Sequence, residues 1–160
     1  MIAAATPQLI LWRHAEAHDP APGESDFERR LTPHGREQAQ WMAKWLGARL
    51  PKDVRVLCSP ARRAQETAHA LTKDVQEIPA LQLVSDGANF LSAIGWPVEG
   101  TIVVVGHQPT LGCAASFLIA GKESDWSVKK GAVWWITRHK RDHDAHVIRA
   151  VIAPDLARGD

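Results

Sequence analysis

This 160-residue chain has few cysteines, little excess of either sign of charge and few long hydrophobic runs, and each of these features argues against a class of protein. The two cysteines, Cys58 and Cys113, provide neither a disulfide framework nor a zinc-ligand cluster, which favours a reducing compartment. The formal net charge of +1 lacks the basic excess of a dedicated nucleic-acid binder. We therefore expect no nucleic-acid partner, and any recognition of anions must be local.

No apolar stretch of the sequence is long enough to span a bilayer. Residues 1–8 also lack the basic and apolar regions of a secretory signal. A hydrophobic content of 45% in 160 residues is enough for one domain with a real core. We expect a single cytoplasmic domain over residues 1–160, with no membrane partner.

Strands and helices are predicted to alternate as far as residue 119. Apolar or β-branched runs predict strands at 9–12, 54–58, 75–78 and 101–106, and helical spacing predicts helices at 33–50, 61–71, 86–94 and 111–119. Thr32, Ser59 and Thr110 are in the right places to begin three of these helices. Residues 18–30 are predicted to form a loop.

Two further strands, at 132–137 and 147–152, are predicted to form a hairpin, followed by a frayed tail at 154–160. The expected fold is a three-layer α/β/α arrangement, with a mostly parallel central sheet and an antiparallel C-terminal hairpin.

Arginine and histidine residues follow three of the predicted parallel strands. Arg13 and His14 come after the first strand, Arg62 and Arg63 lie in the first turn of the helix after the second, and His107 follows the strand at 101–106. Because the carboxyl ends of parallel strands meet at one edge of a sheet, these side chains should converge. Arginines neutralise the oxygens of a phosphoryl group, and a neutral histidine can hold that group covalently. The set predicts phosphoryl transfer that needs neither a metal nor another cofactor.

Four segments around these residues resemble the histidine phosphatase superfamily, which also contains the cofactor-dependent phosphoglycerate mutases. The segments are 11–17, 31–39, 58–68 and 105–109, and they occur in the family's order. Within the family, they look most like the compact branch of bacterial phosphohistidine phosphatases of the SixA type. The resemblance implies that His14 is the phosphorylated nucleophile, that Arg13 and Arg63 bind phosphate, and that His107 is the second pocket histidine. It also implies a phosphohistidine intermediate that water hydrolyses.

A proton donor for the leaving group is harder to assign. Many family members that act on phosphate esters have a carboxylic acid after the third strand, where this chain offers Asp86; Glu16 and Asp19 are other candidates by position. An alkoxide needs a proton to leave, whereas the imidazole of phosphohistidine can depart neutral. The sequence therefore favours a phosphatase for phosphohistidine on a phosphocarrier protein. Alternatives are a phosphatase for a small phosphomonoester, such as a sugar or nucleotide phosphate, and a non-catalytic phosphate-binding module.

Two clusters near the C-terminal hairpin have more than one interpretation. Lys129 and Lys130 form either a solvated pair or a pair that steers an acidic partner. The spacing of His139, His143 and His146 matches no standard metal site and favours a solvated loop.

Overall fold

The computed structural model describes residues 6–142 and 144–159, which build one six-stranded sheet in the order β3-β2-β4-β1-β5-β6. The neighbouring strands β3, β2, β4 and β1 are parallel, whereas β5 runs antiparallel to β1 and β6 runs antiparallel to β5. The predicted fold, with its antiparallel hairpin at one edge, is confirmed. The strands are β1 (Gln8–Arg13), β2 (Arg55–Cys58), β3 (Gln76–Glu77), β4 (Thr101–Gly106), β5 (Val133–Arg138) and β6 (His146–Ile152).

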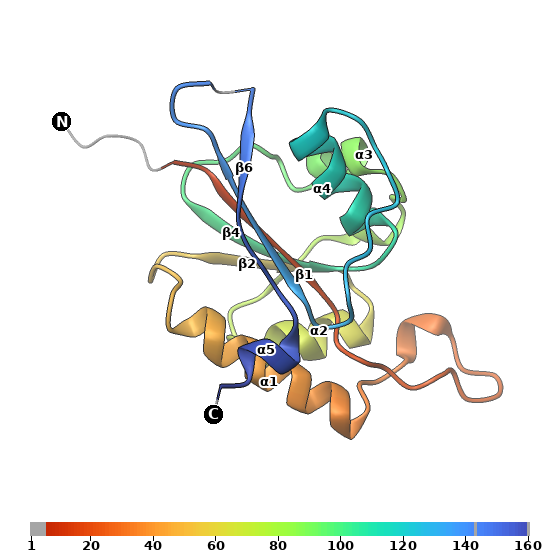
Figure 1. The fold of residues 1–160 in the computed structure, drawn as a ribbon. Helices are drawn as coiled ribbons and strands as arrows, with labels where there is room; N and C mark the ends of the chain where they lie inside the picture. Colours follow the sequence, from red (N-terminus) through yellow and green to blue (C-terminus); the bar gives the residue numbers. More distant parts are fainter. Residues whose placement is uncertain (1–5, 143, 160) are drawn as a thin grey trace.

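Helices cover both faces of the sheet, with α1, α2 and α5 on one side and α3 and α4 on the other (Figure 1). Two short 3-10 turns lie in the connections. Among the helices in the described part of the chain, none has the length and apolarity needed for a bilayer span. The helical elements are α1 (Pro33–Gly47), α2 (Arg62–His69), α3 (Gly87–Ala93), α4 (Thr110–Ala120), α5 (Pro154–Ala157), η1 (Asp26–Glu28) and η2 (Pro79–Gln82).

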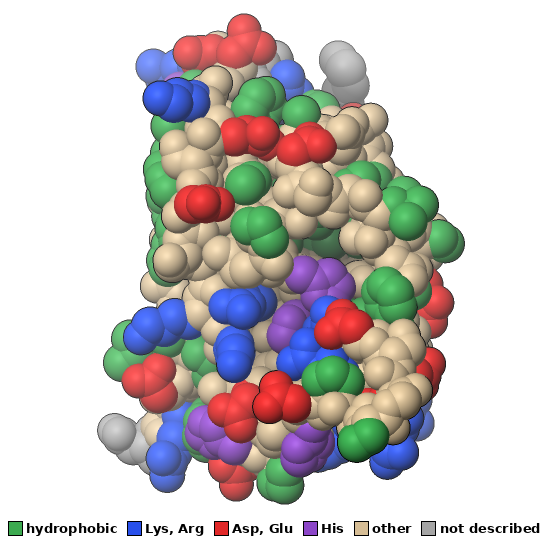
Figure 2. Space-filling model, turned by 90° about the vertical axis from the view of Figure 1, so that its right-hand side faces the viewer, with side chains coloured by type: hydrophobic (Ala, Val, Ile, Leu, Met, Phe, Trp, Pro, Cys, Tyr) green, Lys and Arg blue, Asp and Glu red, His purple; other side chains and the backbone are tan. Residues whose placement is uncertain are grey.

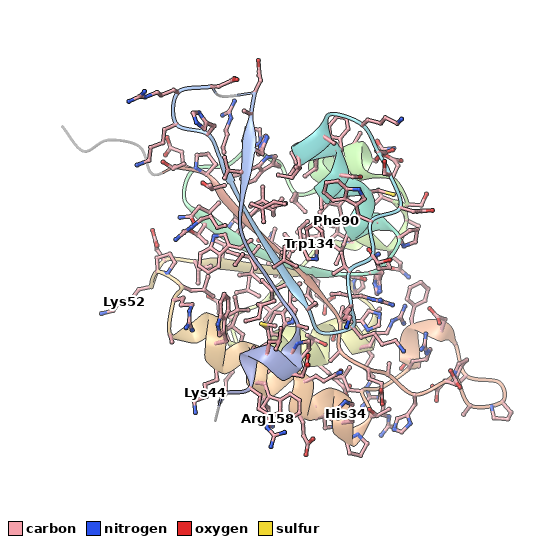
Figure 3. All side chains as sticks on the ribbon, viewed as in Figure 1. His34, Lys44, Lys52, Phe90, Trp134 and Arg158 are labelled. Carbon is pink, nitrogen blue, oxygen red and sulfur yellow. The ribbon has the colours of Figure 1, made fainter. Side chains whose placement is uncertain are left out.

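Alternating residues of the central strands fill the two cores. Leu9 and Leu11 of β1 pack in the cluster that includes Phe90 of α3, and Ile10 and Trp12 pack in the cluster beneath α1 and α2. All four β1 side chains are fully buried. Figure 3 shows Phe90 on the side of the sheet covered by α3 and α4. Burial on both faces explains why β1 and β4 are continuous apolar runs rather than alternating ones.

The predicted starts of the helices are partly correct. Thr32 caps α1, because its Oγ1 accepts a hydrogen bond from Gly35 N at 2.9 Å. The predictions for Ser59 and Thr110 are wrong: α2 begins after Ala61, and Thr110 is already the first residue of α4. The hydroxyl of Ser59 instead contacts a histidine ring of the candidate site.

The predicted frayed tail is wrong for Pro154–Ala157, which forms helix α5 and packs against α1. Proline suits the first turn of a helix, and Pro154 is buried. The guanidinium of Arg158 lies 5.3 Å from the ring centre of Trp41 on α1. A four-residue helix has little stability of its own, so this one depends on tertiary packing. Residue 160 lies outside the described residues.

Candidate active site

The carboxyl ends of β2, β4 and β1 lie side by side at one edge of the sheet. Arg13 is in register with Gly106, and Cys58 is in register with Val105. Beyond the strands the ladder continues, because His14 N donates to Gly106 O at 3.1 Å and Ser59 N donates to Val105 O at 3.1 Å. Residues that are far apart in the sequence are therefore held together by backbone hydrogen bonds.

The predicted residues His14, Arg13, Arg63 and His107 meet at this edge. The ring centres of His14 and His107 are 5.3 Å apart, and Arg63 Nε donates to His14 Nε2 at 3.4 Å. Arg13 Nη1 is held by Val128 O at 2.8 Å. Purple histidine side chains lie together near the centre of the face in Figure 2, next to blue side chains of lysine or arginine. The arrangement combines two imidazoles with two guanidinium groups, a set suited to a phosphoryl group.

His14 is held as one neutral tautomer. Its Nδ1 lies 2.8 Å from the carbonyl oxygen of Ala15, which can only accept, so Nδ1 carries the proton and Nε2 keeps a lone pair. Burial lowers the pKa of His14 to about 3, and the nearby positive charges act in the same direction. At neutral pH this ring is therefore uncharged.

His107 is held by Ser59, whose Oγ lies 2.8 Å from Nε2. Burial and the charge of Arg63 lower the pKa of His107 to about 4, so this ring is also neutral in the pocket at pH 7. Its Nδ1 is buried and has no hydrogen-bond partner among the described residues. A neutral imidazole can still donate one N–H to a phosphoryl oxygen, and a bound anion raises its pKa toward the protonated form.

A buried threonine fixes the peptide that orients His14. Thr67 Oγ1 accepts from Ala15 N at 3.1 Å and donates to Arg63 O at 2.7 Å. Both Ala15 and Thr67 are fully buried. One helical turn of α2 therefore carries Arg63 and also holds the backbone next to His14. The sequence motif contains Thr67, but nothing in its spacing reveals this contact between elements.

Asp26 is a carboxylate of the site that the sequence prediction missed. It lies in η1, and it accepts from Arg63 Nη2 at 3.1 Å and from Arg29 Nη1 at 3.0 Å. Its backbone carbonyl also accepts from Arg63 Nη1 at 2.9 Å. Burial opposes ionisation, but the hydrogen bonds and charges of the two arginines lower the pKa of Asp26 overall. Asp26 is thus a counter-ion rather than a proton donor.

The three predicted acid candidates do not contact either histidine. Asp86 caps α3, and its hydrogen bonds with Asn89 lower its pKa. Glu16 Oε1 accepts from Thr32 Oγ1 at 2.8 Å, on the side of α1. Asp19 is exposed in the loop after β1. None of the three is placed to donate a proton at the paired histidines.

Within residues 6–142 and 144–159, no group of three His, Cys, Asp or Glu side chains could hold a metal ion. His146 Nε2 accepts from Trp96 Nε1 at 3.2 Å, and His139 Nδ1 accepts backbone N–H groups of its own loop. His143, the third member of the predicted cluster, lies outside the described residues.

Comparison with known proteins gives a consistent result. The family model of the histidine phosphatase superfamily (branch 1) matches residues 9–85. An uncharacterised protein of Mycobacterium tuberculosis is 34% identical over 120 residues, which cover 72% of this chain and 75% of that protein. The phosphohistidine phosphatase SixA of Escherichia coli is 28% identical over 124 residues, which cover 72% of this chain and 76% of SixA. A solved structure of the protein histidine phosphatase SixA, in complex with tungstate, superposes with a TM-score of 0.72 at 25% identity, covering 92% of this chain and 97% of that one.

Proposed function

The chain belongs to the histidine phosphatase superfamily and is a phosphatase, and from that premise we propose that it removes the phosphoryl group of phosphohistidine on a phosphocarrier protein. His14 is the nucleophile, His107 is a hydrogen-bond donor, and Arg13 and Arg63 are the phosphate ligands. The likeness to proteins named phosphohistidine phosphatase supports this substrate class.

In the first step, the lone pair of His14 Nε2 forms a bond to phosphorus while the substrate's P–N bond breaks. The guanidinium groups of Arg13 and Arg63 neutralise the phosphoryl oxygens. The departing imidazole keeps the proton on its other ring nitrogen and takes the electron pair of the broken bond. It therefore leaves as a neutral ring and needs no general acid.

In the second step, water attacks phosphorus and the bond to His14 Nε2 breaks. One proton of that water passes to solvent or to the phosphate product. The released His14 is again a neutral imidazole, because its Nδ1–H stays hydrogen-bonded to Ala15 O. Both steps thus break a P–N bond to a ring that is already protonated on its other nitrogen.

The observation that carries the substrate assignment is the state of Asp26. Among the described residues, Asp26 is the carboxylate that is hydrogen-bonded to Arg63 of the pocket, and the charges of Arg63 and Arg29 lower its pKa. A carboxylate held in this form is a poor proton donor for an alkoxide. The pocket is therefore better suited to a leaving group that needs no proton than to a phosphate ester.

The test compares wild-type protein with the His14→Asn variant on two substrates, a histidine-phosphorylated carrier protein and p-nitrophenyl phosphate. We expect the wild type to dephosphorylate the carrier and to form an acid-labile phosphoenzyme that the variant lacks. Equal activity of the two proteins would exclude His14 as the nucleophile. Strong ester turnover without carrier turnover would exclude the substrate assignment.

The alternative substrate, a small phosphomonoester, requires a proton donor. Asp26 would have to be that donor despite its role as a counter-ion, because Asp86, Glu16 and Asp19 do not contact the histidines. If Asp26→Asn abolished hydrolysis of an alkyl phosphate such as glycerol phosphate and left its binding intact, the result would favour a phosphomonoester as substrate. Asp86→Asn is the matched control, because Asp86 caps α3 and is not hydrogen-bonded to Arg63 or Arg29.

A further inference from the structure

A basic cleft of about 530 Å³ adjoins the candidate pocket and shares Arg13 with it. Its lining also includes Lys129, Lys130, His34 and Trp41. The positive charge of Arg13 contributes to the lowered pKa of both His14 and His107, so this guanidinium lies within electrostatic range of both rings. Figure 2 shows blue side chains gathered beside the purple histidines on this face.

The cations of the cleft outnumber its anions. Arg13, Lys129 and Lys130 are positive, and Asp155 is the one carboxylate among the described residues that line it. Both lysines are exposed. In the chain as described, neither ammonium group forms an ion pair or a hydrogen bond, so their charge is available to a partner.

Hydrogen bonds on both sides of the lysine pair fix its position relative to the nucleophile. On one side, Val128 O accepts from Arg13 Nη1 at 2.8 Å. On the other, Gly131 N lies 3.1 Å from the carbonyl oxygens of both Arg13 and His14. The lysine backbone is thus anchored to the end of β1, so binding a partner there costs little ordering of the main chain.

We propose that this cleft binds acidic side chains flanking the phosphohistidine of a protein substrate. The inference rests on the proposed function and specifies further that the protein substrate has acidic residues beside its phosphohistidine. Because Arg13 belongs to both the cleft and the pocket, a carboxylate beside Lys129 and Lys130 lies close to the phosphoryl group.

The test uses two synthetic phosphohistidine peptides of equal length, one with glutamates on both flanks and one with glutamines. The measured quantity is the ratio of their kcat/KM values at low ionic strength. The variants are K129E/K130E and, as a control, K140E/R141E. Lys140 and Arg141 are exposed, lie beyond the opposite end of β5 from the lysine pair, and give the same change in net charge.

In the wild type we expect the acidic peptide to be preferred by about tenfold, the size expected for a few exposed ion pairs. The ratio should fall to about one or below in K129E/K130E and stay near its wild-type value in K140E/R141E. Salt at 0.5 M should weaken the wild-type preference, because these charges are exposed.

Equal wild-type turnover of the two peptides would overturn the docking inference and leave the proposed function intact. The same follows if both double variants lose the preference equally, because the effect would then be one of net charge. If the wild type dephosphorylates neither the peptides nor the phosphorylated carrier protein but hydrolyses p-nitrophenyl phosphate, the proposed function fails and this inference fails with it.

Discussion

Thr67→Val tests how His14, the proposed nucleophile, is held in place. Valine has nearly the same shape as threonine but lacks the hydroxyl that accepts from Ala15 N. The N–H of Ala15 would then be buried without a partner, since Ala15 is fully buried. Thr67→Ser keeps a hydroxyl and serves as the matched control.

The expected size of the effect follows from these contacts. An unsatisfied buried N–H costs roughly 1–3 kcal/mol, so we expect the free energy of unfolding to fall by about 2 kcal/mol. In a chain of this length that lowers the midpoint of thermal unfolding by about 4–8 °C. The hydrogen bond from His14 Nδ1 to Ala15 O is worth roughly 0.5–1.5 kcal/mol, so loosening it should slow phosphoenzyme formation by up to about tenfold.

Two assays decide the matter. Thermal unfolding measures the stability, and single-turnover quenching measures the rate at which His14 is phosphorylated. The reasoning would be refuted if Thr67→Val melted within about 1 °C of wild type and was phosphorylated within about twofold of its rate. It would also be refuted if Thr67→Ser lost as much as Thr67→Val, because the hydroxyl would then not be the group that matters.

Two further predictions concern stability. In the folded protein the pKa of His14 is about 3 and that of His107 is about 4, whereas the unfolded value is near 6.5, so the unfolded chain binds more protons between pH 3 and pH 6.5. Urea titrations should therefore show full stability above pH 6.5 and a loss of stability on acidification. In His14→Asn this loss should be smaller, by on the order of 3 kcal/mol at pH 4. Gly35→Ala should destabilise the protein by about 3 kcal/mol in the same assay, because the added Cβ would lie 2.0 Å from the backbone oxygen of Glu16. Gly47→Ala, on the same helix, has open space around the added Cβ and should be neutral or up to about 1 kcal/mol more stable.

The part of the site that sequence patterns predict lies at the ends of strands. His14 and His107 follow strands whose apolar runs are unambiguous, and parallel pairing then brings them to one edge. The same pattern places two arginines, Arg62 and Arg63, in the first turn of the helix after a strand, and the family resemblance then selects Arg63. The other predictions need only local patterns and one rule about the direction of strands.

Asp26, Thr67 and the role of Ser59 could not be found in that way. Asp26 is one of several acidic residues in a loop without periodicity, and its partner Arg63 is 37 positions away. Thr67 looks like any helical threonine until its contact with Ala15, 52 positions away, is seen. Ser59 resembled a helix cap, because the sequence does not show that α2 begins three residues later. Such contacts depend on the packing of elements and not on the local sequence.

The fold differs from expectation where stability comes from tertiary contacts alone. The four residues of α5 carry no periodic signal that could separate them from a loose tail. They are ordered because Pro154 is buried and because α5 rests on α1. The long helix α1 was predictable for the opposite reason, since its cap and apolar spacing are encoded within the helix itself.

The bonds from Gly131 N to the carbonyls of Arg13 and His14 have a consequence for protein synthesis. His14 leaves the ribosome early, but most of the groups that surround its ring in the folded protein emerge much later. Arg63 comes first, then His107, and then the segment that ends in Gly131. Until they dock, its imidazole is an ordinary solvated histidine with a pKa near 6.5, and Arg13 is the one proposed phosphate ligand beside it. Through most of its synthesis, a nascent chain therefore lacks the complete site around the proposed nucleophile. Fragments that stop before residue 131 should remain unphosphorylated even when they contain the whole His14 motif.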